Sequence, residues 1–215
     1  SSSCGAKRLA IRGFEDMEMD GDALVDLFLE TATLKRVPRA GWFQRGVPHV
    51  ESVAEHSFGV AFMTLALADV VNSESGREGG QAPLDLEKVM AMALLHDLAE
   101  VRLTDLPVSA VRLIPESAKS RAEASAIGDL LVPLPAAGRW KALWQEFEDR
   151  SSPEGQLVRD ADKLEMMVQC LCYEQAGSRG LDEYWKAMDQ RAWHYAVLGE
   201  LYARLREMRT EVATA

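Results

Sequence analysis

The sequence is poor in cysteine. Three cysteines among 215 residues are too few for a disulfide framework, and none of them forms the CxxC pair that is typical of zinc sites. Cys4 lies in a polar N-terminal segment, while Cys170 and Cys172 are two positions apart on a predicted helix and face different directions. We therefore expect a protein of a reducing compartment, the cytoplasm.

We find neither an apolar run of transmembrane length nor a basic, apolar leader segment. Positive charge is also scarce: lysine and arginine number 24 against 34 aspartates and glutamates, which gives a net charge of -10. This balance disfavours binding along a nucleic-acid polymer or an anionic membrane. We expect a soluble protein without membrane or nucleic-acid partners, and a small anionic substrate is compatible with it where cations are concentrated locally.

Period-two alternation is missing as well, whereas apolar residues recur at helical spacing along nearly the whole chain. The pattern predicts an all-α protein, a single helical bundle of about six or seven helices. No change of composition divides the chain, so we assign residues 1–19 to an N-terminal tail and residues 20–212 to one domain. The segment NSESGREGGQAP, residues 72–83, is rich in glycine and serine and predicts a loop.

One predicted helix is interrupted by charge in the stretch ALLHDLAEVRLTDLP, residues 93–107. On a helix, His96 and Glu100 are four positions apart and share a face, with Asp97 beside them. Burying these groups without compensation would cost several kcal/mol for each charge, and a divalent metal would supply the missing positive charge. The alternative is a solvated helix edge, which is the commoner meaning of an isolated His-Asp pair.

Two further helices carry similar residues among apolar neighbours. His56 lies in the first turn of a helix that Ser52 and Glu55 open as a capping box. A third helix carries Asp160 and Asp162, and its apolar periodicity does not decide between them. Imidazoles together with carboxylates suit a divalent transition metal (Mn, Fe, Co, Ni or Zn) better than Mg or Ca.

Four segments in this order resemble the HD-domain metal-dependent phosphohydrolases: LKRVPRAGW, ESVAEHSFGVA, HDLAEVRLTDLP and DADKLEMMVQCLCYE. Within that superfamily the sequence is similar to the 5'-deoxynucleotidase branch, of the bacterial YfbR type and, more nearly, of the HD-domain-containing protein 2 type. The resemblance covers residues 34–174 and implies an HD-domain helical fold.

The resemblance implies that one metal ion is bound by His56, His96, Asp97 and Asp162. It is this resemblance that selects Asp162, and Asp160 would then be solvated or would support the ligands. HD proteins with two metals carry additional histidines between the HD pair and the last aspartate. This chain has none there, which favours a mononuclear site, and His49 and His194 are expected to be ordinary loop and helix residues.

The same resemblance implies hydrolysis of (deoxy)nucleoside 5'-monophosphates to nucleoside and phosphate. Glu100 and Asp105 would line the active site and handle protons, and which of them is the base stays open. Arg36 matches the arginine that contacts the substrate phosphate, and it lies in a basic stretch without acidic residues, 31–50. Bacterial members have a tryptophan directly after that arginine, whereas this chain has Val37 there and its tryptophan at Trp42. The choice between deoxyribose and ribose is therefore open.

Two other functions are compatible with these motifs. The domain could act on other small phosphorylated metabolites or on nucleoside di- and triphosphates, or it could be a non-catalytic scaffold stabilised by its metal. Members of the family are commonly homodimers, and four tryptophans could serve either an interface or the core: Trp140, Trp144, Trp185 and Trp193.

Overall fold

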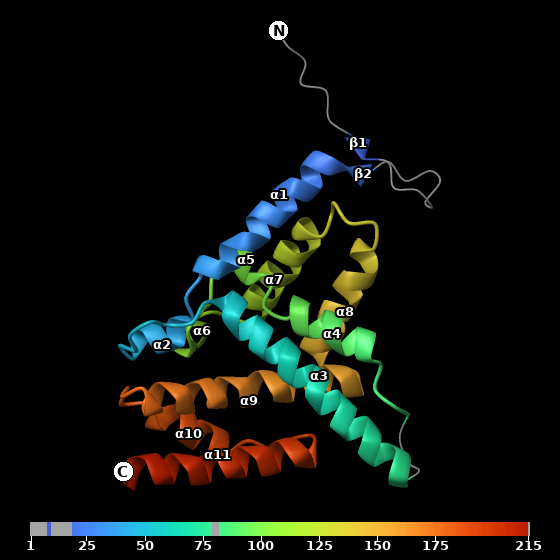
Figure 1. Cartoon of the computed structure of the whole chain (residues 1–215). Helices are drawn as coiled ribbons and strands as arrows, with labels where there is room; N and C mark the ends of the chain where they lie inside the picture. Colours follow the sequence, from blue (N-terminus) through green and yellow to red (C-terminus); the bar gives the residue numbers. More distant parts are fainter. Residues whose placement is uncertain (1–7, 10–18, 79–81, 215) are drawn as a thin grey trace.

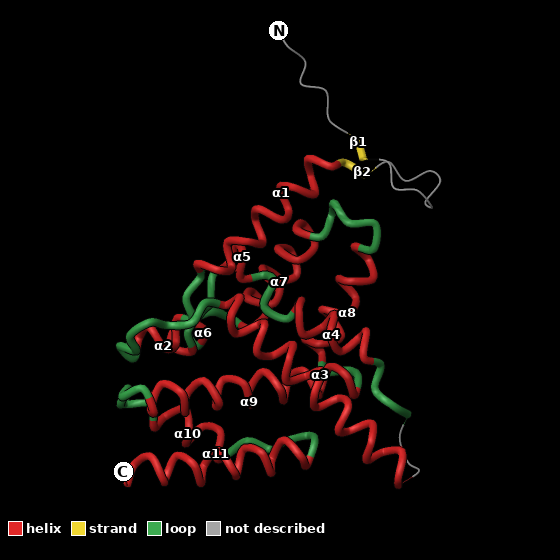
Figure 2. Tube along the Cα trace, viewed as in Figure 1, coloured by secondary structure: helices red, strands yellow, loops and turns green. Residues whose placement is uncertain are grey.

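The computed structural model describes residues 8–9, 19–78 and 82–214, which form a bundle of helices (Figure 1). In chain order the elements are β1 (Arg8–Leu9), β2 (Met19–Asp20), α1 (Gly21–Thr31), the 3-10 helix η1 (Ala32–Arg36), α2 (Ala40–Gln44), α3 (Val53–Glu78), α4 (Leu86–Leu95), α5 (Glu100–Leu103), α6 (Val108–Val111), α7 (Glu116–Leu130), α8 (Ala137–Asp149), α9 (Pro153–Gln175), α10 (Asp182–Asp189) and α11 (Ala196–Thr214). Figure 2 shows how the loops join these helices.

The all-α prediction is confirmed. Within the described ranges, α1, α3, α4, α7, α8, α9 and α11 each have ten residues or more, in agreement with the six or seven helices expected. The shorter α2, α5, α6 and α10 were not predicted. The two short strands pair antiparallel, with Arg8 opposite Asp20 and Leu9 opposite Met19. Most of the tail assigned to residues 1–19 lies outside the described residues.

Helix α3 packs against α4 and α9 (Figure 1). It begins with the predicted capping box: Ser52 donates to the Glu55 carboxylate from its backbone N–H at 2.6 Å and from its hydroxyl at 2.8 Å, and the Glu55 N–H donates to Ser52 Oγ at 3.2 Å. The prediction that residues 72–83 form a loop was wrong at its start, because α3 continues to Glu78. Within the last turns of α3, the side chain of Asn72 accepts a hydrogen bond from the Leu84 N–H at 2.7 Å and donates one to the Leu84 carbonyl at 3.1 Å. These bonds connect α3 to the segment before α4.

By length and composition alone, Val53–Glu74 of α3 could cross a membrane, with a mean hydropathy of 1.3. The expectation that the sequence contains no apolar run of that length is wrong by this measure. One side of this segment packs on α4 and α9, and 39% of its most apolar 18 residues is buried. The same helix carries the fully buried His56 in its first turn. The buried side of α3 therefore belongs to the core of the domain.

The main core lies where α3, α4, α9, α10 and α11 meet. Its fully buried side chains include Val60, Val89, Met92, Leu157, Met167, Trp185 and Leu198. Burying a side chain of this size stabilises a fold by about 1.5–3 kcal/mol. A second cluster under α5, α7 and α8 contains Leu95, Ile127, Leu131 and Trp144. Trp185 and Trp144 are therefore core residues, whereas Trp140 is 37% exposed.

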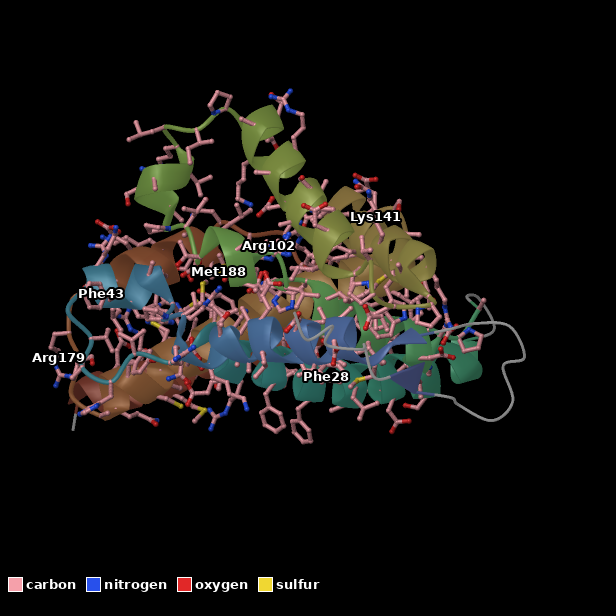
Figure 3. All side chains as sticks on the ribbon, turned by 90° about the horizontal axis from the view of Figure 1, so that it is seen from above. Phe28, Phe43, Arg102, Lys141, Arg179 and Met188 are labelled. Atoms are coloured by element: carbon pink, nitrogen blue, oxygen red, sulfur yellow. The ribbon has the colours of Figure 1, made fainter. Side chains whose placement is uncertain are left out.

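Helix α4 ends at Leu95, earlier than the sequence pattern predicted. Residues 96–99 form a tight turn in which the Glu100 N–H donates to the Asp97 carbonyl at 3.0 Å. Helix α5 then begins at Glu100 and carries Arg102 (Figure 3). Arg102 bonds Glu30 of α1 at 2.7 Å and Asp129 of α7 at 3.4 Å. This turn, rather than a continuous helix, presents His96 and Asp97 to α3 and α9.

Candidate metal centre and substrate cavity

Two histidines on different elements place their Nε2 atoms 3.4 Å apart. His56 is fully buried in the first turn of α3, and His96 is 4% exposed directly after α4. The Nδ1–H of His96 donates to the Ala93 carbonyl at 2.7 Å, and the Nδ1–H of His56 donates to Glu165 at 2.5 Å. With both Nδ1 atoms engaged as donors, both Nε2 atoms present lone pairs to the same space, as metal-binding histidines do.

Two carboxylates complete this cluster. Asp97 Oδ2 lies 3.2 Å from Nε2 of His96 and 3.6 Å from Nε2 of His56, while Asp162 Oδ1 lies 3.3 Å from Nε2 of His56. Metal–ligand bonds of about 2.1 Å put neighbouring ligand atoms roughly 3 Å apart. The structure thus places ligand atoms of His56, His96 and Asp97 within 4.8 Å of one another and Asp162 beside His56, and this donor set fits a divalent transition metal.

Asp160 and Asp162 have separate environments although they are two residues apart on α9. Asp160 is 2% exposed and accepts hydrogen bonds from Arg191 at 2.6 Å and from the backbone N–H groups of His194 and Tyr195 at 2.7 and 3.3 Å. It therefore joins α9 to the segment between α10 and α11. The expectation of a solvated or ligand-supporting Asp160 was wrong.

A second layer of acidic groups supports His56. Glu165 is 6% exposed and lies against Gly59 of α3, where an added Cβ atom would be 2.6 Å from Glu165 Oε1. Only glycine allows this close approach. Behind Glu165, Glu51 accepts a hydrogen bond from Trp42 Nε1 at 2.9 Å, and burial together with the charge of Glu165 raises the pKa of Glu51 to about 7.

A cavity of about 810 Å³ opens beside the four clustered residues. Its wall includes His96, Asp97 and Asp162, with further residues from α2, α5, α6, α7, α9 and α10. Pockets for small molecules usually measure about 300–1,000 Å³. The candidate metal centre is therefore open to a space that could admit a nucleotide-sized ligand, whereas structural metal sites are closed.

Glu100 and Asp105 both line this cavity. Among the described residues, Glu100 Oε2 is a buried atom without a hydrogen-bond partner. Burial, with the added charges of Asp97 and Asp105, raises the pKa of Glu100 to about 9. Asp105 instead accepts a hydrogen bond from the Ala40 N–H at 2.5 Å. Perturbed buried acids in a cavity are candidates for proton transfer, which singles out Glu100.

The structure does not bring Arg36 to the cavity wall. Arg36 is exposed at the end of η1, whereas Arg39, three residues later, lines the cavity. Arg39 Nη1 lies 3.3 Å from Asp97 Oδ2 and 3.7 Å from Asp105 Oδ1. Its side chain is 13% exposed, so its charge is directed at the candidate site rather than at solvent.

Trp42 is not available as a stacking surface for a base. It is 2% exposed, and its ring packs between Tyr173 and Tyr184 with centroids 5.5 and 4.3 Å away. Tyr184 of α10 is the more exposed member of this aromatic group and lines the cavity. Trp42 is thus mainly a core residue.

Sequence reasoning missed two functional candidates, Lys163 and Glu165, and it considered Arg39 only as one cation of the basic stretch without assigning it to the site. Glu165 is three positions after Asp162, so helical spacing alone would place it on a neighbouring face of the same helix. Lys163 follows Asp162 directly. Arg39 lies in an irregular stretch with three other cations, where no periodicity distinguishes the inward side chain from the exposed ones.

Comparisons with known proteins show what this chain is similar to. A family model described as HD domain matches residues 31–196. A Danio rerio protein named 5'-deoxynucleotidase HDDC2 is 31% identical over 196 residues, which cover 89% of this chain and 91% of that protein. The Homo sapiens protein of the same name is 34% identical over 143 residues, 66% of this chain and 63% of that protein. A crystal structure of a protein from Pyrococcus horikoshii OT3 has 41% sequence identity and a TM-score of 0.67, and the match covers 84% of this chain and 99% of that one.

Proposed function

The chain belongs to the HD-domain family, and on that premise we propose that it is a metal-dependent phosphomonoesterase that hydrolyses deoxynucleoside 5'-monophosphates to nucleoside and phosphate. The observation that supports the proposal is that His56, His96 and Asp97 cluster, with Asp162 beside His56, next to an open cavity whose wall holds a buried acid without a partner among the described residues. Relatives named 5'-deoxynucleotidase support the substrate class.

The metal would be held by His56, His96, Asp97 and Asp162. We propose one ion of Mn, Co, Fe, Ni or Zn, since two imidazoles in the ligand set favour these over Mg or Ca. When bound, such an ion supplies charge neutralisation for a phosphate oxygen and increases the acidity of a water molecule.

The chain's own residues divide the remaining work. Arg39 carries a planar guanidinium at the cavity wall, and a guanidinium suits binding of phosphate oxygens. Glu100 Oε2 has no competing partner among the described residues and can exchange a proton with water or with the leaving 5'-oxygen. Asp105 is already engaged by Ala40 and Arg39, so we assign it to positioning Arg39.

The decisive experiment measures phosphate release by the purified protein loaded with Mn or Co. A panel of deoxynucleoside and ribonucleoside 5'-monophosphates should yield orthophosphate, and the ratio between the two sugars gives the selectivity that Val37 leaves open. Release of pyrophosphate or tripolyphosphate from di- and triphosphates would indicate the alternative substrate class. No product from any nucleotide, with metal bound, would contradict the proposal and leave two alternatives: hydrolysis of other small phosphorylated metabolites, or a non-catalytic scaffold.

We further propose that the protein is a homodimer and that α3 supplies its contact surface. Phe58, Phe62 and Leu65 are 73%, 65% and 41% exposed and follow one another at spacings of four and three residues, so they form one apolar stripe. Contiguous exposed apolar side chains commonly mark contact surfaces. Phe62→Glu should reduce the mass measured by light scattering to that of a monomer, whereas Val132→Glu, at a residue 72% exposed elsewhere, should not. An unchanged mass for Phe62→Glu would exclude this surface.

We also propose a cytoplasmic location. Cys170 and Cys172 are both free, one buried and one exposed, and thiols stay reduced in that compartment. Fractionation of cells that express the intact protein tests the location, and recovery from a membrane or secreted fraction would contradict it.

A further inference from the structure

The ammonium group of Lys163 lies at the edge of the four clustered ligand residues. Its Nζ is 2.9 Å from Asp162 Oδ2, while Oδ1 of the same carboxylate lies 3.3 Å from Nε2 of His56. Lys163 lines the cavity, and its side chain is 31% exposed. The charge of Lys163 is thus one carboxylate away from the candidate metal position and faces the space that a substrate would enter.

This ammonium group has unused hydrogen-bonding capacity. An ammonium carries three N–H donors, and Asp162 is the one ion-pair partner of Lys163 within the described part of the chain. Arg39 is the corresponding cation on the other ligand carboxylate, at 3.3 Å from Asp97 Oδ2. The two cations come from separate elements, the N-terminus of α2 and the middle of α9, and both reach the cavity wall.

Charge balance gives Lys163 a specific role. The wall beside the centre carries the carboxylates of Asp97, Asp105 and Asp162, while the raised pKa of Glu100 keeps that acid protonated near neutral pH. A divalent ion together with Arg39 would offset the three carboxylates, and Lys163 adds one further positive charge. A phosphate group that approaches this wall is negative itself, so removal of Lys163 would take away the surplus positive charge that attracts it.

Arg159, one helical turn before Lys163, has a different environment. Its guanidinium lies 4.5 Å from the centroid of the Phe147 ring, and its Nη2 lies 3.8 Å from Glu148. It also lines the cavity, but it contacts neither ligand carboxylate at ion-pair distance among the described residues. Lys163 is therefore the cation of α9 that is paired with a carboxylate of the candidate metal centre.

We propose that Lys163 binds a non-bridging oxygen of the substrate phosphate and acts together with Arg39 as the second cationic contact of that phosphate. The inference rests on the proposed phosphomonoesterase function and adds a residue to its substrate-binding site. The chemical class it recognises is a phosphate monoester, and orthophosphate, the product, would make the same contact.

Two measurements on Lys163→Met test the proposal: calorimetric binding of inorganic phosphate to the metal-loaded protein, and kcat/KM for a deoxynucleoside monophosphate. A hydrogen bond to a charged group contributes about 1.5–3 kcal/mol, which corresponds to roughly a 10- to 100-fold loss in each quantity. Lys163→Arg should restore part of both, because it keeps the charge. Metal content and melting temperature should remain those of the wild type.

Lys141→Met is the matched control, because the substitution removes the same charge. Lys141 lies on α8, outside the cavity wall (Figure 3). It should bind phosphate as the wild type does. Unchanged phosphate binding in Lys163→Met would overturn the proposal. Loss of metal from Lys163→Met would also overturn it, since Lys163 would then act through Asp162. If the wild type binds phosphate but releases none from any nucleotide, the proposed function fails while the calorimetric comparison still decides the role of Lys163.

Discussion

His56 of α3 donates a hydrogen bond from Nδ1 to Glu165 of α9 at 2.5 Å. This contact fixes the rotation of a fully buried imidazole, so that its Nε2 faces Asp97 and Asp162. Gly59 makes the approach of Glu165 feasible, because a side chain at that position would occupy the space of the carboxylate. Two helices that are remote in sequence thus determine the direction of one ligand lone pair.

Glu165→Gln is expected to weaken metal binding by about 10- to 100-fold, because a neutral amide orients and polarises the imidazole less than a carboxylate does. Titration of the metal-free protein with Co or Zn measures this affinity. Glu87→Gln, at an exposed residue of α4 that pairs with Arg139, should bind metal as the wild type does. An unaltered affinity in Glu165→Gln would mean that Glu165 has only a packing role.

Substitutions of the neighbouring aspartates should have separate effects. Asp162→Asn removes an anionic ligand and should empty the metal centre, as measured by elemental analysis after gel filtration. Asp160→Asn should retain the metal but lower the free energy of unfolding by about 1–3 kcal/mol, since it weakens the contacts with Arg191 and the His194 and Tyr195 backbone. Metal loss in Asp160→Asn with full metal in Asp162→Asn would reverse the assignment.

Glu100→Gln tests the assignment of proton transfer. The substitution preserves the size of the side chain but removes its titratable proton, so turnover should fall by about 10²- to 10⁴-fold. Metal content and circular dichroism should be unchanged, because Glu100 Oε2 makes no hydrogen bond with the described residues. Activity close to that of the wild type would remove Glu100 from the chemistry and leave Asp105 as the remaining candidate.

Local sequence patterns were sufficient for part of this site. The capping box of Ser52 and Glu55 predicted where α3 begins, and therefore that His56 lies in a first turn. The tight turn at His96 and Asp97 was not predicted. Its backbone hydrogen bonds join residues three positions apart, and the apolar spacing of such a turn is nearly the same as that of a continuous helix. Its consequence for function is small, since Glu100 still reaches the cavity.

The direction of the basic side chains could not be predicted. Residues 31–50 contain no long periodic element, and Arg36 and Arg39 are separated by a 3-10 helix end and by Pro38. Their orientation depends on the bridge that Pro38 makes with Ser52 and on the Val53 N–H bonded to the Val37 carbonyl at 2.8 Å. These are long-range contacts that a single sequence does not reveal.

Arg39→Met and Arg36→Met should therefore differ in their kinetics. Arg39 lies at the cavity wall between Asp97 and Asp105, so its loss should reduce kcat/KM for a nucleotide by about 10- to 100-fold. Arg36 is exposed at the end of η1, and its loss should change kcat/KM by less than about 2-fold. Steady-state assays at fixed ionic strength measure both. A large loss of kcat/KM in Arg36→Met alone would mean that Arg36, and not Arg39, contacts the phosphate.

Glu51 should make the stability of the protein depend on pH. Burial and the charge of Glu165 raise the pKa of Glu51 from 4.5 to about 7 in the folded protein. Between these values the folded state binds more protons than the unfolded chain, so this group's contribution to stability is fully present below pH 4.5 and decreases as the pH rises to about 7. A glutamine at this position can still accept the hydrogen bond from Trp42 but does not titrate.

Relative to the wild type, Glu51→Gln should gain free energy of unfolding as the pH rises from 4.5 to 8, by roughly 3 kcal/mol in total. Urea unfolding of both metal-free proteins across this range measures the difference. Glu55→Gln is a control of opposite sign, because the backbone and hydroxyl of Ser52 lower the pKa of Glu55. Its stability relative to the wild type should fall as the pH rises through the titration of that carboxylate. A difference for Glu51→Gln that is independent of pH would contradict the raised pKa of Glu51 in the folded protein.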